Sequence, residues 1–211
     1  MTTQPRKPDY FFHVEGVTLP EELRETLIEQ SKAKTSLFHS SQAANPEIIY
    51  RFDISRSVRD VMYTINKIDS CPAVEGTSYV PNWNTPELKI LWDMIHPEAQ
   101  EHVAYIILQG SQPYGFMSPH KDWEHFREYR KAVMFIPLTP YDAEEWAPLT
   151  YYNEAGHTKV AEVEWSPCYV ADSQKVHGYE NNNNYRASAA IAFDCGEATI
   201  HTLYEQGKLM A

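Results

Sequence analysis

The sequence predicts a mainly β protein with helical support, in which a jelly-roll core follows helices that pack on one of its sheets. Two observations predict this fold class. Short segments rich in β-branched and aromatic residues follow one another between residues 103 and 193, with Pro, Gly, Asn or Asp between them. The residues before them show helical periodicity instead. Helices that precede a run of short strands favour a β-sandwich or jelly roll with helices on one face.

The N-terminal half is predicted to contain one strand and three helices. Residues 10–14 are apolar and aromatic, which favours a strand. Pro20-Glu21-Glu22 is typical of a helix start, and Thr85-Pro86 marks a second such start. Between these two helices, residues 55–68 carry a stripe with a period of 3.6, which predicts a further helix. The stripe consists of Val58, Val61, Met62, Ile65 and Ile68.

The C-terminal half is predicted to contain six strands. They cover residues 103–109, 131–138, 149–152, 158–164, 168–171 and 186–193. A chain of 211 residues with 43% apolar content can bury one substantial core. We therefore expect a single domain over residues 1–211: helical support over about 1–100, a double-stranded β-helix (jelly-roll) core over about 101–195, and a tail over 196–211.

Composition excludes several classes of partner. The net charge of −11 argues against nucleic acid, because binding to phosphate backbones needs clustered Lys and Arg. The three cysteines are an odd number without CxxC spacing, which suits reduced thiols inside a cell. The N-terminus does not resemble a signal peptide, and no apolar run is long enough for a membrane span. We therefore expect a cytoplasmic protein without a membrane partner, and the sequence does not specify its oligomeric state.

The first candidate functional residues are in His120-Lys121-Asp122, which ends an apolar, β-rich run. In an extended chain the side chains of His120 and Asp122 point to the same face, so both can reach one metal ion. Random placement of the nine His and nine Asp residues gives about 0.4 such triplets, so the triplet is weak on its own. A hydrogen-bonded pair at a strand end is the alternative interpretation.

Further candidate residues follow downstream. His177 precedes Arg186-Ala187-Ser188, which opens the last long predicted strand. Period two places Arg186 and Ser188 on one face of that strand, together with small alanine side chains that leave room for a ligand. An Arg-x-Ser in a four-residue window at this distance from a given His occurs by chance about 0.01 times. The combination is therefore far less accidental than its parts.

Together these residues resemble the Fe(II)- and 2-oxoglutarate-dependent oxygenases, whose pattern is His-x-Asp, a distal His and Arg-x-Ser. The resemblance covers roughly the C-terminal half. It implies that His120, Asp122 and His177 are the catalytic metal ligands and that Arg186 and Ser188 bind 2-oxoglutarate. The segment that leads into His120 is also loosely similar to that of prolyl-hydroxylase-type members, and within it Tyr114 is a further candidate donor to the cosubstrate, ahead of Tyr105 and Tyr151.

The residue types suit this chemistry. Two imidazoles and one carboxylate form the facial triad of non-haem Fe(II) enzymes, with positions left open for other ligands. An Arg fork matches the far carboxylate of a 2-oxo acid at a sheltered site. The resemblance implies Fe(II), 2-oxoglutarate and O2 as cofactor and cosubstrates, with hydroxylation of an unactivated C–H bond and release of succinate and CO2. The substrate is expected to be a small molecule or an amino-acid or peptide side chain.

Two groups of related enzymes differ from this sequence in their motif residues, and the differences limit the reactions and substrates that we expect. Related halogenases replace the carboxylate of the triad with a small residue, so Asp122 favours oxygen transfer over halide transfer. Nucleic-acid repair members place a second Arg a few residues after the first. No Arg follows Arg186 in its strand, which agrees with the acidic charge of the chain.

Other interpretations remain open from the sequence. His177 could be a core histidine, and Arg186 could form an ordinary ion pair with Asp194 or Glu180. The protein could also be a cupin-type metalloenzyme, or a metal-binding β-sandwich, that does not use 2-oxoglutarate. For the rim of a substrate pocket we expect the aromatic segments around Trp123 and across residues 141–152, and Trp123 is the candidate substrate residue.

Overall fold

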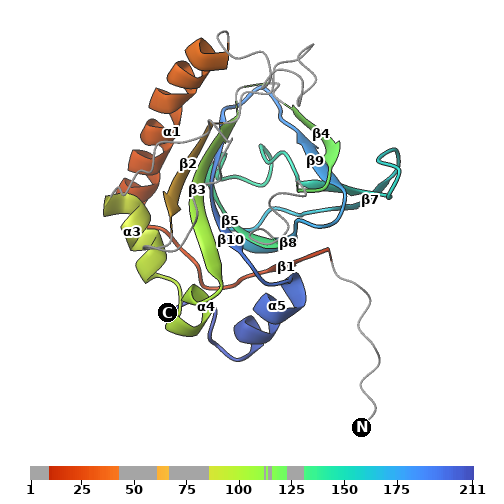
Figure 1. Ribbon diagram of the computed structural model, residues 1–211. Coiled ribbons are helices and arrows are strands. Elements are labelled where there is room, and N and C mark those ends of the chain that lie inside the picture. Colours follow the sequence, from red (N-terminus) through yellow and green to blue (C-terminus); the bar gives the residue numbers. More distant parts are fainter. Residues whose placement is uncertain (1–9, 43–60, 67–85, 112, 114–115, 123–130) are drawn as a thin grey trace.

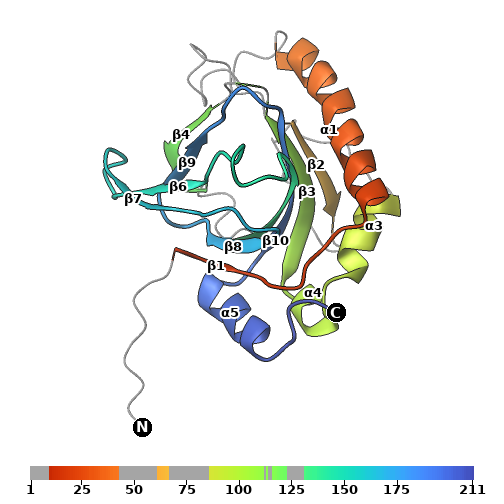
Figure 2. The ribbon, with the colours of Figure 1, turned by 180° about the vertical axis from the view of Figure 1, so that it is seen from behind.

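Two antiparallel β-sheets face each other and enclose the interior in which the candidate site lies (Figures 1 and 2). The computed structural model describes residues 10–42, 61–66, 86–111, 113, 116–122 and 131–211. The larger sheet has the strand order β1-β8-β5-β10-β3-β2, and the smaller sheet has the order β4-β9-β6-β7.

The strands are divided between the two sheets. In the larger sheet they are β1 (Phe11–His13), β8 (Tyr169–Asp172), β5 (Ala132–Thr139), β10 (Arg186–Phe193), β3 (Val103–Ser111) and β2 (Val61–Asn66). In the smaller sheet they are β4 (Phe116–His120), β9 (His177–Glu180), β6 (Thr150–Tyr152) and β7 (Lys159–Glu162). The strands β3 to β10 are shared between the two sheets in the order of a double-stranded β-helix, so the predicted fold class is confirmed.

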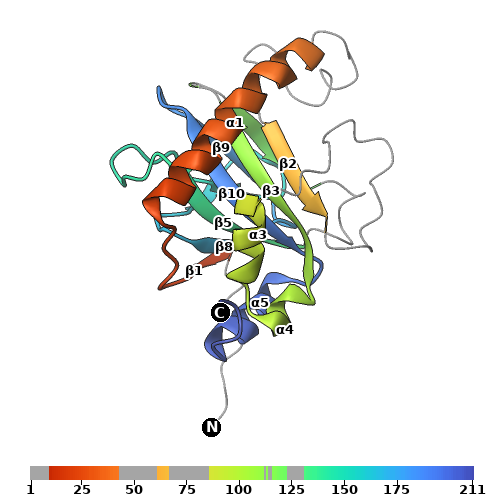
Figure 3. The ribbon, with the colours of Figure 1, turned by 90° about the vertical axis from the view of Figure 1, so that its left-hand side faces the viewer.

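Helices cover the outer face of the larger sheet. Figure 3 shows α1 (Glu21–Gln42) lying across this sheet, with α3 (Pro86–Asp93) beside it. The short α4 (Pro97–Gln100) and the C-terminal α5 (Glu197–Glu205) pack at one end of the barrel (Figure 1). The predicted helix starts at residues 20 and 86 are confirmed. None of the helices in the described ranges is both long and apolar enough to cross a bilayer.

Strand β10 divides the core into two layers because its side chains alternate between the faces of the sheet. Ala189 and Ile191 belong to the layer between the larger sheet and the helices, with Leu27 and Leu91. Ala190 and Ala192 belong to the layer between the sheets, with aromatic residues such as Tyr151 and Tyr169. All eight residues of β10 are buried. Arg186 and Ser188 share the inward face of β10 with Ala190 and Ala192.

The prediction of a helix over residues 55–68 is wrong for the part that the structure describes. Val61–Asn66 forms strand β2, which pairs with β3 from Val61 opposite Gly110 to Asn66 opposite Tyr105. The apolar stripe has helical spacing, but the segment is also rich in Val, Tyr, Thr and Ile, which suit a pleated surface. Pairing with the edge of β3 satisfies its backbone polar groups, and this tertiary contact overrides the local pattern.

Two elements in the C-terminal part were not foreseen. The sequence analysis placed no strand at residues 177–180, yet β9 lies there, between β4 and β6. It assigned residues 196–211 to a tail, yet they include α5, whose Ile200 is fully buried, and Leu209, which is also buried. A four-residue strand and a nine-residue helix carry too little periodicity to be predicted from local pattern.

Replacing Gly110 with alanine is expected to lower the free energy of unfolding by about 1–3 kcal/mol. Gly110 lies in β3, where an added Cβ would collide with the hydroxyl oxygens of Tyr185 and Ser31, which hydrogen-bond to each other and tie α1 to the sheet. Gly196→Ser is the control, because a Cβ there meets no atom within 4 Å and serine suits a helix N-cap. Denaturant unfolding of both variants measures the difference, and equal stabilities would contradict this packing.

Candidate metal centre and cosubstrate pocket

The end of β4 and the start of β9 bring two histidines together. His120 and His177 are directly opposite each other in this antiparallel pair, so their side chains lie on the same face. Their ring centroids are 4.6 Å apart. Asp122 follows β4, and its backbone N–H donates to the carbonyl oxygen of Ser173 at 3.1 Å, which fixes the segment after the strand. Two chain segments, residues 120–122 and 173–177, thus bring the three side chains together.

One ligand atom from each of the three side chains lies within 4.8 Å of the other two. Asp122 Oδ1 lies 3.8 Å from His120 Nε2 and 3.8 Å from His177 Nε2. This distance exceeds a hydrogen bond, so His120 and Asp122 are not the directly hydrogen-bonded pair of the alternative interpretation. The three side chains could therefore hold one metal ion together.

The orientation of His177 suits metal binding. Its Nδ1 lies 2.8 Å from the carbonyl oxygen of Lys175, which can only accept, so Nδ1 carries the proton. The ring then presents the lone pair of Nε2 toward Asp122. His177 is 4% exposed and Asp122 is 8% exposed, whereas the side chain of His120 is 35% exposed. The centre is thus closed on the His177 side and more open on the His120 side.

Neighbouring groups hold the site in place. Lys121, between the two motif residues, pairs with the exposed Glu154 at 2.6 Å and lowers the pKa of that carboxyl. Tyr151 lies opposite His177 on β6 and donates to the carbonyl oxygen of Asp172 at 3.2 Å. Burial, with the nearby carboxylate of Asp172, raises the pKa of Tyr151 well above its ordinary value. Tyr151 is therefore neutral, its ring lines the site, and its hydroxyl is already hydrogen-bonded to Asp172.

Arg186 lies at the first position of β10, buried between aromatic rings. Its guanidinium carbon is 4.4 Å from the ring centroid of Tyr179 and 4.7 Å from that of Trp146. No carboxylate among the described residues pairs with it: Asp194 lies beyond the far end of β10 and pairs with His102, and Glu180 is exposed. Arg186 is only 6% exposed, so its charge is sheltered from solvent. The simple ion-pair interpretation therefore finds no support in the described part of the chain.

Tyr169 is a further candidate site residue, which the sequence analysis did not identify. It lies on β8, is fully buried, and has a hydroxyl without a hydrogen-bond partner among the described residues. Arg186 Nη1 is likewise buried and unpaired there. Burial raises the pKa of Tyr169 to about 12, and the nearby charge of Arg186 lowers it by less. Tyr169 Oη and Arg186 Nη1 thus lie close enough to interact electrostatically, yet neither makes a well-formed hydrogen bond among the described residues.

Other predicted residues are placed as follows. Ser188 is buried on β10, two residues after Arg186 and on the same face. Tyr114 and Trp123 lie outside the described residues, and so does the side chain of Tyr105. Trp146 lies within the segment 141–152 that was expected at a substrate rim, and its ring packs against the guanidinium of Arg186. Tyr179 was also missed, because the strand β9 that places it on the same face as His177 was not predicted.

Comparisons with known proteins give distant structural likenesses. No protein-family model matches the chain, and no curated protein sequence matches it. A Pseudomonas putida prolyl-4-hydroxylase is similar with 13% identity and a TM-score of 0.46, over 84% of this chain and 89% of that chain. The viral collagen prolyl hydroxylase of Paramecium Bursaria Chlorella virus-1, in a 2OG complex, has 10% identity and a TM-score of 0.48, over 88% and 96%.

A third similar structure is the non-heme alpha ketoglutarate dependent epimerase SnoN from nogalamycin biosynthesis. Its identity is 13% and its TM-score is 0.49, over 87% of this chain and 77% of that chain. These solved structures include proteins of the oxygenase family that the sequence motif resembles. Because the likenesses are distant, the fold rests here on the strand order, and the site on the side chains described above.

Proposed function

We propose that this protein is an Fe(II)- and 2-oxoglutarate-dependent dioxygenase that hydroxylates an unactivated C–H bond of a small molecule or of an amino-acid or peptide side chain. The supporting observation is the convergence of His120, Asp122 and His177 between the sheets of a double-stranded β-helix. Two imidazoles and one carboxylate are the donor set of the facial triad, which leaves coordination positions for a chelating cosubstrate and dioxygen.

An Fe(II) ion held by these residues would supply the activation of dioxygen, coupled to oxidation of 2-oxoglutarate to succinate and CO2. The protein holds and shields the reactants. His177 is fixed in the ligating tautomer by the carbonyl oxygen of Lys175, and Asp122 is held by its backbone hydrogen bond to Ser173. The buried ring of Tyr151, whose centroid lies 6.2 Å from that of His177, excludes water from the inner side of the centre.

Arg186 and Tyr169 would hold the distal carboxylate of 2-oxoglutarate. Both present buried donor atoms that lack acceptors among the described residues, and a carboxylate supplies acceptors for both. The rings of Tyr179 and Trp146 keep the guanidinium in position and away from solvent. A charge-assisted hydrogen bond in such a sheltered place is about twice as strong as a neutral one, which makes Arg186 the main anchor.

Tyr169→Phe is expected to raise the 2-oxoglutarate concentration needed for half-maximal turnover by about threefold to tenfold, which corresponds to one neutral hydrogen bond. The ring and its packing stay, so the stability of the protein should change little. Tyr204→Phe is the matched control, because this tyrosine lies on α5 at the outer end of the barrel. An unchanged 2-oxoglutarate requirement in Tyr169→Phe would exclude the phenol from the pocket.

Anaerobic titration tests the proposed function directly. Addition of Fe(II) and then 2-oxoglutarate to metal-free protein should produce the weak visible charge-transfer absorption of the chelate. Iron that binds without this absorption would favour the alternative of a cupin-type metalloenzyme. Absence of stoichiometric iron would favour a β-sandwich binding protein and would contradict the proposal. Succinate formation stimulated by individual amino acids, peptides or metabolites would then identify the substrate.

A further inference from the structure

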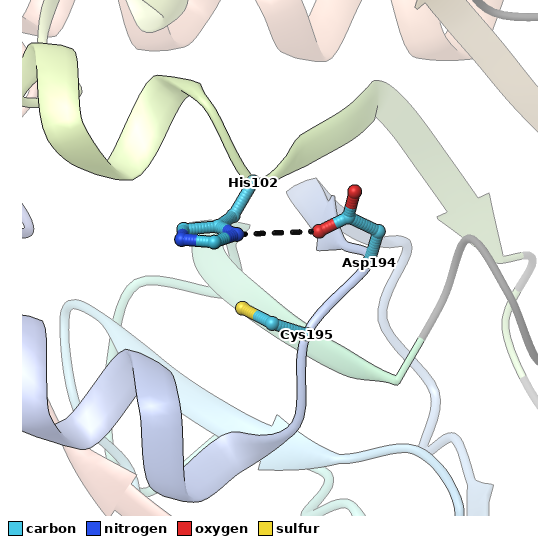
Figure 4. Close-up of side chains that lie close together, drawn as sticks. All are labelled: His102, Asp194 and Cys195. Atoms are coloured by element: carbon cyan, nitrogen blue, oxygen red, sulfur yellow. Dashed lines mark ion pairs between the residues drawn. The ribbon is translucent and has the colours of Figure 1, made fainter.

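A second group of side chains that could hold a metal ion lies beyond the opposite end of β10 from Arg186. His102, Asp194 and Cys195 each offer one ligand atom, and these three atoms lie within 4.8 Å of one another. His102 Nδ1 is 3.4 Å from Asp194 Oδ1. Figure 4 shows the three side chains converging, with His102 before β3 and the other two in the link between β10 and α5. None of these residues belongs to the site described above.

A register shift in the larger sheet creates this arrangement. Ala192 lies opposite Tyr105, but Phe193 lies opposite Val103, so β3 contains one extra residue at this point. The shift carries Asp194 to the position opposite His102, and the backbone N–H of Asp194 donates to the carbonyl oxygen of His102 at 2.9 Å. Without the register shift, Asp194 would lie opposite Val103. A bulge of this kind changes the direction in which side chains point. Here it brings the carboxylate of Asp194 close to the imidazole of His102.

Cys195 brings a sulfur atom to the same point. It precedes Gly196, the N-cap of α5, and it is half-buried against the core layer under the helices. Burial, with the adjacent carboxylate of Asp194, raises the pKa of Cys195 to about 11. The thiol is therefore protonated at neutral pH, and a divalent cation that binds the sulfur must displace this proton into solvent. Cys195 is a free cysteine in this structure.

We propose that His102, Asp194 and Cys195 form a second metal site for a borderline divalent cation of the zinc class, with water as the fourth ligand. Imidazole nitrogen, carboxylate oxygen and thiolate sulfur are the three ligand types that Zn²⁺ accepts in tetrahedral sites. The thiolate disfavours Mg²⁺ and Ca²⁺, and it distinguishes this site from the triad, which offers only nitrogen and oxygen. The side chains of His102 and Asp194 are 37% and 45% exposed, so an ion can enter from solvent.

An ion at this site would join the turn before β3 to the start of α5. Figures 1 to 3 place α5 at the end of the molecule away from β4 and β9, which carry the histidines of the triad. An ion at the second site would thus fix the start of the C-terminal helix to the larger sheet. This role does not depend on the proposed dioxygenase activity.

Cobalt binding tests the site in a chain that lacks the histidines of the triad, His120→Ala with His177→Ala. Metal-free protein of this background should bind about one Co²⁺ per chain and show the near-ultraviolet absorption of a thiolate-to-cobalt bond, and Zn²⁺ should displace it. Adding Cys195→Ser should abolish the absorption, whereas adding Cys71→Ser, which removes another of the three thiols, should leave it intact. Failure to bind Co²⁺ or Zn²⁺, or absorption that persists without Cys195, would overturn the proposal.

Alkylation of the native sequence provides a second measurement that removes no ligand. Zn²⁺ should slow the reaction of Cys195 with iodoacetamide by about tenfold or more, because a metal-bound thiolate reacts poorly. Peptide mass analysis separates Cys195 from the other thiols. In His102→Ala, with its fold verified by circular dichroism, the protection should be lost. Equal rates with and without Zn²⁺, or equal protection in His102→Ala, would exclude the site.

Discussion

His177→Ala is expected to lower the affinity for Fe(II) by more than about 100-fold and to reduce turnover to background. Loss of a residue that only supports a metal ligand typically lowers metal affinity or activity by about 10- to 100-fold, so loss of a ligand should exceed this range. His177 is also the most buried member of the triad, being 4% exposed, and its Nδ1 is held by the carbonyl oxygen of Lys175. Equilibrium binding of Fe(II), followed by the absorption of the 2-oxoglutarate chelate, measures the effect.

The matched control for this experiment is His157→Ala. His157 is exposed and lies between β6 and β7, outside the triad, so its removal should leave iron binding and turnover unchanged. Thermal unfolding of both variants separates loss of metal from loss of fold. Turnover close to the wild-type rate in His177→Ala would contradict the assignment of this residue as a ligand, and loss of activity in both variants would indicate a nonspecific effect.

Arg186→Ala is expected to raise the requirement for 2-oxoglutarate by about 30-fold to several thousand-fold, which corresponds to about 2–5 kcal/mol for truncating one partner of a buried, hydrogen-bonded charge pair. Ser188→Ala should raise it by at most about tenfold, because a hydroxyl contributes one neutral hydrogen bond. Arg186→Lys should lie between them, since lysine keeps the charge but lacks the planar fork. Succinate formation as a function of 2-oxoglutarate concentration provides the measurement.

A change of cosubstrate separates loss of this anchor from loss of structure. A 2-oxo acid without a distal carboxylate cannot use Arg186, so its utilisation should be poor in the wild type and little altered in Arg186→Ala. The preference for 2-oxoglutarate over that acid should therefore collapse in the variant. Equal small effects of Arg186→Ala and Ser188→Ala on 2-oxoglutarate use would remove Arg186 from this role, and an equal loss with both oxo acids would point to misfolding.

The candidate centre could be predicted because its information is local. The i and i+2 spacing of His120 and Asp122 holds in any extended segment, and Arg186 and Ser188 share a face for the same reason. The strand pattern between residues 103 and 193 likewise reflects the period of the pleat and the turn residues between the strands. Such features need no knowledge of distant contacts, and they led to both the fold class and the triad.

The wrong prediction of a helix over residues 61–66 arose because the deciding information is not local. Their apolar spacing fits a helix, and only the available edge of β3 decides that they form a strand. The position of Tyr169 beside Arg186 is likewise non-local, because it depends on β5 lying between β8 and β10 in the sheet. Neither fact has a signature within a short window of sequence, since both depend on which strands become neighbours.

By itself, the sequence determined the double-stranded β-helix class, the likeness of the motif to one oxygenase family, and the residues that could bind a metal and a 2-oxo acid. Only the tertiary structure decided that β4 and β9 bring His120 opposite His177, and that aromatic rings enclose Arg186. It alone also showed that a one-residue register shift sets Asp194 against His102. The physical reason is that side-chain type and period are local properties of the chain, whereas pairing and register arise from its global packing.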